Sequence, residues 1–261
     1  TSPSSKGIEI VSGAKVTKLA SNIIKNSSLS GIYIVSSDVT SVKENTIKSP
    51  STQGVIIASS SKVGALSSNT VKNSKSQGIY ISGSDVTSAK KNTVVSPISQ
   101  GIAIVYSSRV GEVSSNTVKK SKSAGLYISS SDVTEAVKNT ITSPASYGIE
   151  IVSDSQADEV SLNIINKSKK TGLYVMSSEI KSAKSNEIYG RSITRVGIRI
   201  EASTVKKISS NIVKKCKKFG LYVTKKTTVD KASKNTYKGC KKEIYVSENS
   251  TVEKIIDSKE R

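Results

Sequence analysis

The chain has 261 residues, a formal net charge of +20 and no histidine, and 35% of its residues are hydrophobic but only 4% are aromatic. Without histidine, Ser-His-Asp and Cys-His catalysis and histidine-based metal sites are excluded, and no run of about 20 apolar residues provides a membrane-spanning helix. This composition is lean for a globular core but adequate for a solenoid, in which each coil buries a narrow file of aliphatic side chains.

A segment of the form Gly-Ile-x-Ile recurs along the whole chain at intervals of 23 to 25 residues. The copies begin at Gly7, Gly31, Gly54, Gly78, Gly101, Gly125, Gly148, Gly172, Gly197, Gly220 and Glu243. This period excludes α-helical solenoids, whose repeats have about 33 to 47 residues. We therefore expect residues 1–261 to form a single domain of about eleven stacked coils, and this domain to be a segment of a larger extracellular protein. The N-terminal residues read neither as a signal peptide nor as an anchor.

Each coil contains three short apolar segments that are separated by polar turns. In the copy that begins at Gly125, apolar and outward residues alternate over residues 126–128, which is the period of a strand with one buried face. Val133 and Ala136 follow as a second inward file, and residues 139–141 mark a third. The pattern predicts three short strands and three turns in each coil.

The first segment of every coil contributes two aliphatic side chains to the expected core. These pairs are Ile8/Ile10, Ile32/Ile34, Val55/Ile57, Ile79/Ile81, Ile102/Ile104, Leu126/Ile128, Ile149/Ile151, Leu173/Val175, Ile198/Ile200, Leu221/Val223 and Ile244/Val246. Because no coil breaks the pattern, we expect a core of Ile, Val and Leu along the whole stack.

Asparagine forms a second column, immediately before the third segment. Its members are Asn22, Asn45, Asn69, Asn92, Asn116, Asn139, Asn163, Asn186, Asn211 and Asn235. Amide side chains stacked about 4.8 Å apart can hydrogen-bond up and down such a column. We therefore assign these asparagines to turns and to a structural ladder, and not to ligand binding.

These columns resemble the parallel β-helix repeats of the pectate-lyase-like superfamily, in which Gly-Ile-x-Ile, a following Val or Ile, and Asn-x-Ile wind into a right-handed stack. The resemblance covers essentially the whole chain and implies an all-β, single-stranded right-handed parallel β-helix (a β-solenoid) about 50 Å long. It leaves the activity open, because the superfamily includes pectin-cleaving lyases and hydrolases, uronate epimerases, phage tailspikes and non-catalytic surface proteins. The Gly-His-Gly segment of its hydrolases is absent, and no specific enzyme family is matched.

Charged residues alternate in sign at one position of the second segment. This column contains Asp38, Lys62, Asp85, Arg109 and Asp132. At a coil spacing of about 4.8 Å each acid lies between two bases, so we expect an ion-pair ladder. Calcium or an acid/base pair needs adjacent carboxylates instead. We expect no metal site, no cofactor and no catalytic residue.

Tyrosine recurs at the outward position of the first segment in alternate coils. The row comprises Tyr33, Tyr80, Tyr127, Tyr174 and Tyr222. Rings at a pitch of about 9.6 Å, which is two coil spacings, could stack on the sugar faces of a glycan that lies parallel to the rod. The alternative is that tyrosine serves as a strand residue that covers neighbouring aliphatic surface.

The repeat is lengthened by two residues in the turn before Gly197. The longer turn contains Tyr189, Arg191 and Arg195, and Arg199 follows in the next segment. These four residues are candidates for ligand binding, because an irregular turn on a uniform scaffold is a common place for function. An insertion without a function is the alternative.

Cys216 and Cys240 occupy one column, in which earlier coils carry serine. Their Cα atoms would lie about 4.8 Å apart, which is within the range that a disulfide tolerates. A disulfide that joins two coils and a pair of buried thiols are both consistent with this pattern. The two cysteines alone do not form a metal-binding motif.

Positive charge is concentrated near the C-terminus. From Arg191 to Lys242 the chain has sixteen Lys or Arg residues and two acidic residues, a net charge of +14. This charge attracts polyanions such as acidic polysaccharides and cell-wall polymers, and a merely solvated surface is the alternative. Only five of the forty cations are arginine, which argues against nucleic acid, because arginine makes the bidentate contacts to phosphate and guanine.

These features favour a non-catalytic β-helix of a secreted or cell-surface bacterial protein. It would bind an anionic polysaccharide through the tyrosine row and the basic C-terminal coils, or serve as an adhesin or spacer. Coils of 23 to 25 residues leave short turns, whereas an enzyme on such a scaffold needs long loops to wall a cleft. A polysaccharide lyase or uronate epimerase acting on acidic glycans, and a purely structural stalk, are the alternatives.

Overall fold

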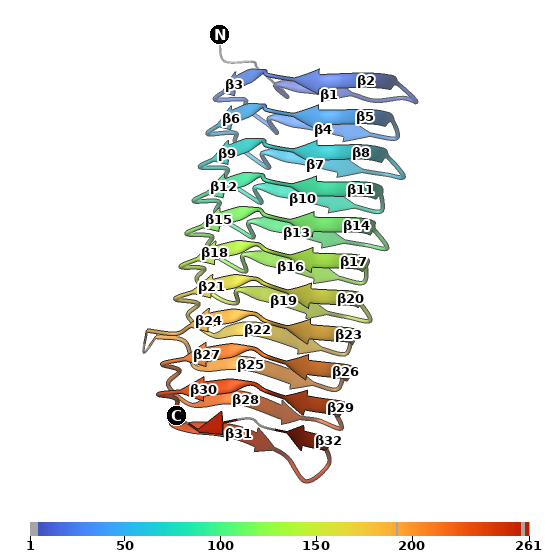
Figure 1. Ribbon diagram of the computed structural model, residues 1–261. Coiled ribbons are helices and arrows are strands. Elements are labelled where there is room, and N and C mark those ends of the chain that lie inside the picture. The colour runs from blue at the N-terminus through green and yellow to red at the C-terminus, as the bar shows by residue number, and fades with distance from the viewer. Residues whose placement is uncertain (1–4, 192, 257–258, 261) are drawn as a thin grey trace.

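The computed structural model describes residues 5–191, 193–256 and 259–260. In these residues the regular elements are β-strands, and three strands per coil wind into a right-handed parallel β-solenoid (Figure 1). Equivalent strands of successive coils pair in parallel, which gives three sheets of eleven strands each within the described part of the chain. The predicted all-β parallel β-solenoid is therefore confirmed.

The Gly-Ile-x-Ile segments form the first sheet. Its strands are β1 (Ile8–Ile10), β4 (Ile32–Val35), β7 (Val55–Ala58), β10 (Ile79–Ser82), β13 (Ile102–Val105), β16 (Leu126–Ser129), β19 (Ile149–Val152), β22 (Thr171–Met176), β25 (Val196–Glu201), β28 (Phe219–Thr224) and β31 (Lys242–Val246). Side chains alternate between the two faces of a strand. In β10, Ile79 and Ile81 are therefore fully buried, whereas Tyr80 points outward.

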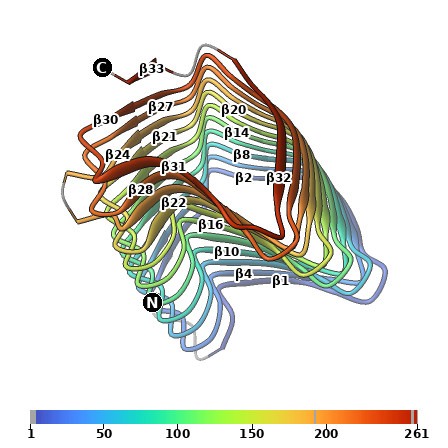
Figure 2. The same cartoon turned by 90° about the horizontal axis from the view of Figure 1, so that it is seen from below.

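The second sheet consists of six-residue strands that follow the first turn of each coil. They are β2 (Lys15–Ala20), β5 (Asp38–Lys43), β8 (Lys62–Ser67), β11 (Asp85–Lys90), β14 (Arg109–Ser114), β17 (Asp132–Val137), β20 (Gln156–Ser161), β23 (Glu179–Lys184), β26 (Thr204–Ser209), β29 (Thr228–Ser233) and β32 (Thr251–Ile256). A view along the stack shows the coils superimposed, with the three sheets as successive sides of one cross-section (Figure 2).

The third sheet closes each coil with a short strand. Its strands are β3 (Ile23–Lys25), β6 (Thr46–Lys48), β9 (Thr70–Lys72), β12 (Thr93–Val95), β15 (Thr117–Lys119), β18 (Thr140–Thr142), β21 (Ile164–Asn166), β24 (Glu187–Tyr189), β27 (Ile212–Lys214), β30 (Thr236–Lys238) and β33 (Lys259–Glu260). The middle residue of each strand from β3 to β30 points into the core.

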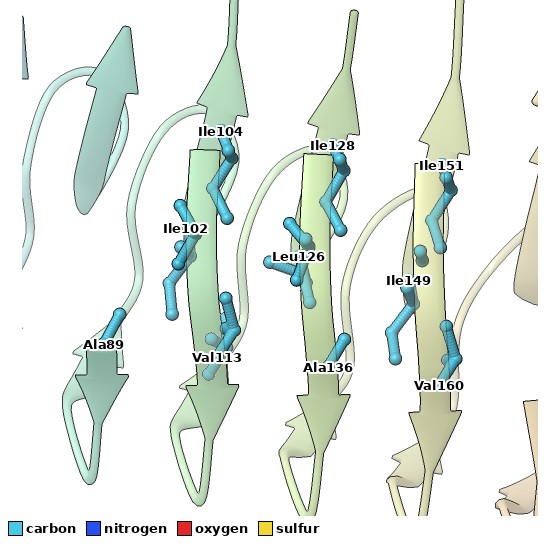
Figure 3. Close-up of a cluster of buried hydrophobic side chains, with 14 of the residues drawn as sticks. Ala89, Ile102, Ile104, Val113, Leu126, Ile128, Ala136, Ile149, Ile151 and Val160 are labelled. Atoms are coloured by element: carbon cyan, nitrogen blue, oxygen red, sulfur yellow. The ribbon is translucent and has the colours of Figure 1, made fainter. Parts of the chain in front are cut away.

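Aliphatic columns fill the interior, as Figure 3 shows for the central coils. In the second sheet, one buried column alternates large and small residues: Leu66, Ala89, Val113, Ala136, Val160 and Ala183. These residues pack with the Ile and Leu pairs of the first sheet in one continuous cluster. From Leu66 to Ala183, two successive coils therefore form the repeating unit of this column.

The glycine column marks a place where the backbone approaches the third sheet too closely for a side chain. A Cβ atom on Gly78 would lie 2.2 Å from Cγ1 of Val94 and 2.7 Å from the carbonyl oxygen of Gly101. Neither distance is compatible with a real contact. Steric exclusion explains why glycine recurs at the start of the first strand.

The asparagine column forms a hydrogen-bonded ladder that we call the Asn ladder. Nδ2 of Asn92 donates to Oδ1 of Asn116 at 3.0 Å and to the carbonyl oxygen of Leu66 at 2.8 Å. Oδ1 of Asn92 accepts from both the backbone N–H and the Nδ2 of Asn69, each at 3.0 Å. All hydrogen-bonding groups of this fully buried amide are therefore paired, and the side chain fixes the turn between the second and third strands.

Candidate functional site

The outward residues of the first sheet form a column whose character changes along the rod. In the N-terminal half, Tyr33, Tyr80 and Tyr127 are half-buried. Ile56 and Ala103 lie in register on the strands between them. The three rings thus occupy alternate strands, as their spacing in the sequence requires.

From β22 to β31 the outward column has no aliphatic residue. Tyr174, Arg199, Tyr222 and Tyr245 lie in register on four adjacent strands. The guanidinium carbon of Arg199 is 5.4 Å from the ring centroid of Tyr174 and 5.5 Å from that of Tyr222. The rings of Tyr222 and Tyr245 are stacked, with centroids 5.1 Å apart. A cation therefore lies between aromatic rings, in the geometry of a cation–π interaction.

Two further aromatic residues lie beside this column. Tyr147 stacks on Tyr174, with ring centroids 4.8 Å apart and an interplanar angle of 17°. Phe219 lies 4.8 Å from the ring centroid of Tyr222 and 5.5 Å from that of Tyr245. The C-terminal half of the first sheet thus presents a contiguous group of five aromatic rings around Arg199.

A buried carboxylate holds Arg199 and Tyr174 in place. Glu201 is only 2% exposed, and it accepts hydrogen bonds from Nη2 of Arg199 at 2.6 Å and from the hydroxyl of Tyr174 at 2.9 Å. Thr224 and Lys225 complete its set of partners. Burial acts against ionisation of Glu201, but the hydrogen bonds from Arg199 and Tyr174 outweigh it and hold its pKa below the ordinary value. These contacts are expected to restrict the orientation of the guanidinium group.

The aromatic residues and nearby cations surround a depression of about 230 Å³, which we call the aromatic-cationic pocket. Its lining residues are Tyr147, Lys170, Thr171, Arg195, Val196, Arg199, Lys218, Phe219 and Tyr222. Lys170, Arg195 and Lys218 are exposed. The Nε atom of Arg199 is buried and has no hydrogen-bond partner among the described residues. The pocket thus combines flat apolar surfaces with positive charge.

Glu150 precedes this group in the same outward column and lies in register between Tyr127 and Tyr174. Burial raises its pKa to about 7, against the opposing effect of Lys170. The carboxyl group of Glu150 therefore changes its charge near neutral pH, next to the stacked rings of the pocket.

The structure divides the predicted binding residues between different places. Tyr174 is only 7% exposed, because Tyr147, Arg199 and Glu201 cover it, so the prediction of a uniform exposed tyrosine row is wrong at this position. Tyr222 lines the aromatic-cationic pocket together with Tyr147 and Arg199. Tyr33, Tyr80 and Tyr127 are not among the residues that line the pocket.

The longer turn between β24 and β25 separates residues that the sequence places together. Tyr189 and Arg191 line a second depression with Lys214 and Lys215, on the side of the third sheet. Nζ of Lys214 lies 5.5 Å from the ring centroid of Tyr189. Arg195, at the end of the same turn, lines the aromatic-cationic pocket instead.

The alternating charged column has the predicted register but not the predicted contacts. Lys62 pairs in register with Asp38 and Asp85, and Arg109 with Asp85 and Asp132. These side chains are exposed, and none of them belongs to an ion pair found in the described part of the chain. The prediction of an ion-pair ladder is therefore wrong, because water solvates these charges at little cost.

Cys216 and Cys240 are free thiols and do not form a disulfide. Cys216 is buried, and Cys240 is half-buried. Of the two alternatives that the sequence allows, the structure therefore contains the pair of thiols.

Several pocket residues have no distinct signal in the sequence. Tyr147 and Phe219 stand directly before repeat glycines, at a position where other coils carry Ser, Gln, Ala, Thr, Val or Lys. An alignment of this column would have shown two aromatic exceptions. Glu201 lies in an otherwise basic region, and this isolation of an acid is the only sign of its role.

Comparison with protein families identifies the coil pattern. Residues 100–257 match the family described as right handed beta helix region. The chain belongs to this right-handed β-helix family. The N-terminal part of the β-helix, residues 2–131, is similar to the family described as periplasmic copper-binding protein (NosD). Comparisons with curated proteins and with solved structures give no significant match.

The part of the β-helix that is similar to NosD does not fit a copper site. Residues 2–131 contain no histidine, cysteine or methionine, whereas copper sites are built from imidazole, thiolate and thioether ligands. Among the described residues, no group of three or more His, Cys, Asp or Glu side chains is placed to hold a metal ion. Nor does any helix within 5–191, 193–256 and 259–260 have the length and apolarity to cross a membrane.

Proposed function

We propose that this β-helix binds an acidic polysaccharide in the aromatic-cationic pocket. The observation that carries the proposal is the position of Arg199 between Tyr174 and Tyr222, beside Tyr147 and Phe219. Aromatic rings offer flat apolar surfaces against which the C–H faces of sugar rings can pack. The cations of the pocket would pair with the carboxylates of the same polymer.

The distribution of charge in the pocket favours an acidic over a neutral sugar. Lys170, Arg195 and Lys218 are exposed at the pocket, whereas Glu201 is buried and already paired with Arg199. Among the residues that the structure describes, the Nε–H group of Arg199 has no hydrogen-bond partner. A carboxylate in the pocket would supply this donor with a partner and would balance the exposed cations.

Calorimetric titration of the purified chain with short oligogalacturonates tests this proposal, with neutral oligosaccharides of equal length for comparison. We expect binding of the acidic sugars only. Tyr222→Ala removes one pocket ring and should weaken binding roughly fivefold, since an aromatic contact contributes about 1 kcal/mol. Tyr80→Ala is the matched control, because Tyr80 occupies the same column outside the pocket.

The results also separate this proposal from its alternatives. If Tyr222→Ala and Tyr80→Ala reduced the affinity for the acidic sugars equally, the tyrosine row as a whole would bind them, and not the pocket. Release of unsaturated sugars, which absorb in the ultraviolet, would identify a polysaccharide lyase. Failure to bind any of several uronate oligomers would contradict the proposal.

We also propose that the protein acts in the periplasm or outside the cell. Acidic polysaccharides are found there, and residues 2–131 are similar to a family described as periplasmic. Fractionation of the source cells with an antibody against this chain would test the location. Recovery of the protein in the cytoplasmic fraction would contradict it.

A further inference from the structure

The net charge of the chain lies almost entirely on one of its three sides. We define the cationic edge as the third-sheet strands of ten coils together with the turns that follow them. It comprises residues 23–30, 46–53, 70–77, 93–100, 117–124, 140–147, 164–171, 187–196, 212–219 and 236–242. These segments contain nineteen Lys or Arg residues and one acidic residue, Glu187, so their net charge is +18 of the total of +20.

Strand pairing places like charges on this edge next to each other. Lys25, Lys48 and Lys72 are in register on adjacent strands, as are Lys214 and Lys238. Neighbouring strands lie about 4.8 Å apart, and like charges directly opposite each other destabilise a sheet. The edge therefore carries an electrostatic cost that an anionic partner would relieve.

The ion pairs found in the described part of the chain lie outside this edge. The ion pairs found among residues 5–191 and 193–256 use cations outside it: Lys6, Lys43, Lys90, Lys181, Lys184, Arg199 and Lys225. Most of the edge lysines are exposed, including all three of Lys119, Lys120 and Lys122. Their charges thus face solvent along most of the length of the rod.

The cationic edge and the aromatic-cationic pocket form one continuous surface. Lys170, Arg195 and Lys218 belong to both, because they lie in the turns that lead from the third sheet into the first. The second depression, with Tyr189 and Lys214, is also part of the edge. A polymer that occupies the pocket can therefore continue along the edge without leaving positive surface.

We infer that the ligand is a long linear uronate polymer that lies parallel to the rod axis, with its carboxylates along the cationic edge. The choice of a uronate rests on the function proposed above. Turns with several cations recur in every second coil, around residues 75, 122, 169 and 217. Since neighbouring strands lie about 4.8 Å apart, these turns are spaced about 9.6 Å apart along the rod. Of the nineteen cations only Arg191 and Arg195 are arginine, which favours carboxylates over the phosphates of nucleic acid.

The chain itself supplies substitutions that remove charge from the edge without disturbing the coil. The coil that contains β15 has lysine at positions 119, 120 and 122. The following coil has Thr142, Ser143 and Ala145 at the equivalent positions. Lys120 and Ser143 share a left-handed backbone, with φ of 56° and 55°. The triple variant K119T/K120S/K122A therefore copies a sequence that the same fold already accommodates.

A control variant removes the same number of charges from the second sheet. Lys206, Lys207 and Lys231 are exposed there. At equivalent positions the second-sheet strand β11 carries Thr87 and Ser88, and K206T/K207S/K231S follows that pattern. Both variants lower the net charge by three, so a difference between them reports the position of the charges.

Affinity for long polygalacturonate and for short oligogalacturonates, measured at low salt, tests the inference. We expect the edge variant to bind the long polymer roughly tenfold more weakly than the control variant, since three exposed charges contribute about 0.5 kcal/mol each. Both variants should bind the short oligomers equally well. The difference for the polymer should shrink as salt rises.

Equal losses of polymer affinity in the two variants would overturn the inference, because net charge alone would then account for binding. Single-stranded RNA should be tested in parallel. The inference would also be overturned if the edge variant lost affinity only for this RNA. Absence of binding to short oligomers, combined with edge-dependent binding of the polymer, would contradict the proposed pocket function but would support the edge. The two proposals can therefore fail separately.

Discussion

At the scale of single residues, the Asn ladder shows how much one buried amide contributes. Oδ1 of Asn116 accepts two hydrogen bonds from Asn92, and its Nδ2 donates to Asn139 and to the carbonyl oxygen of Ala89. Asn116 is fully buried. Water cannot replace these partners without opening the stack.

We predict that Asn116→Ala lowers the free energy of unfolding by about 3 kcal/mol or more, because it leaves several buried polar groups unpaired at about 1–3 kcal/mol each. Urea denaturation followed by circular dichroism measures the change. Asn22→Ala is the control, since Asn22 is only part-buried at the start of the ladder. A cost as large for Asn22 as for Asn116 would contradict this explanation.

Leu162 is a residue in an unfavourable conformation. It is 48% exposed and has a φ angle of 55°, which falls in the left-handed region that bulky side chains tolerate poorly. Leu162→Asn should raise the free energy of unfolding by about 1 kcal/mol, because asparagine adopts this conformation more readily. Leu162→Ala, which removes the same apolar surface without that preference, should give no comparable gain in thermal melting experiments.

At the scale of elements, the sequence predicts the features that repeat in every coil but not the features that differ between coils. The inward file of the first sheet and the place of the Asn ladder repeat in every coil, so each copy reinforces the others. The pocket depends on differences between coils. The strands β22, β25 and β28 begin before their repeat glycines, whereas β19 begins after Gly148. This extension places Phe219 beside Tyr222, and no repeating pattern announces it.

The cationic edge illustrates a different reason for incomplete prediction. Linear counting along the chain finds the basic C-terminal region, because those residues are close in sequence. The edge consists of short segments spaced one coil apart, and its charge becomes evident only when equivalent positions are aligned across the third sheet. Lys48 and Lys72 are neighbours only because the coils stack.

Glu150 makes the first sheet sensitive to pH. Its pKa in the folded chain, about 7, exceeds the ordinary value of 4.5. The folded state therefore binds more protons than the unfolded state between these values, and the contribution of Glu150 to stability decreases as pH rises through this window. Below the window the carboxyl group is protonated in both states and the effect disappears.

We predict that Glu150→Gln raises the free energy of unfolding by roughly 1–2 kcal/mol at about pH 8, since each pKa unit corresponds to about 1.4 kcal/mol and partial exposure reduces the effect. At about pH 4 the variant and the parent chain should be equally stable. Melting temperatures across this range provide the measurement. A constant difference at all pH values would show that packing, and not ionisation, is responsible.

At the scale of the whole molecule, the alternation of large and small core residues means that coils are not interchangeable. Leu66 is followed by Ala89, and Val113 by Ala136, in the buried column of the second sheet. Removal of two coils preserves this alternation, whereas removal of one brings two residues of similar size together. In a linear stack, stability depends on contacts between neighbouring coils.

We predict that deletion of residues 79–125, a two-coil unit, gives a shorter folded rod with Leu66 next to Ala136. Deletion of residues 102–125 alone places Ala89 next to Ala136 and creates a cavity. The single-coil deletion should therefore have the lower melting temperature although it retains more coils, since cavities in a core cost about 1 kcal/mol or more. The opposite order of melting temperatures would contradict the two-coil description.

The Asn ladder also gives the rod an electrical direction. From Asn22 to Asn211, the Nδ2 of each asparagine donates to the Oδ1 of the next asparagine toward the C-terminus, so each Oδ1 from Asn45 to Asn235 accepts from the N-terminal side. The amide dipoles are therefore aligned head to tail, as peptide dipoles are in an α-helix, where they sum to a macrodipole of about half a charge at each end. The positive pole of this side-chain macrodipole lies at Asn235, among the basic C-terminal coils, so the two ends of the rod differ in potential as well as in sequence.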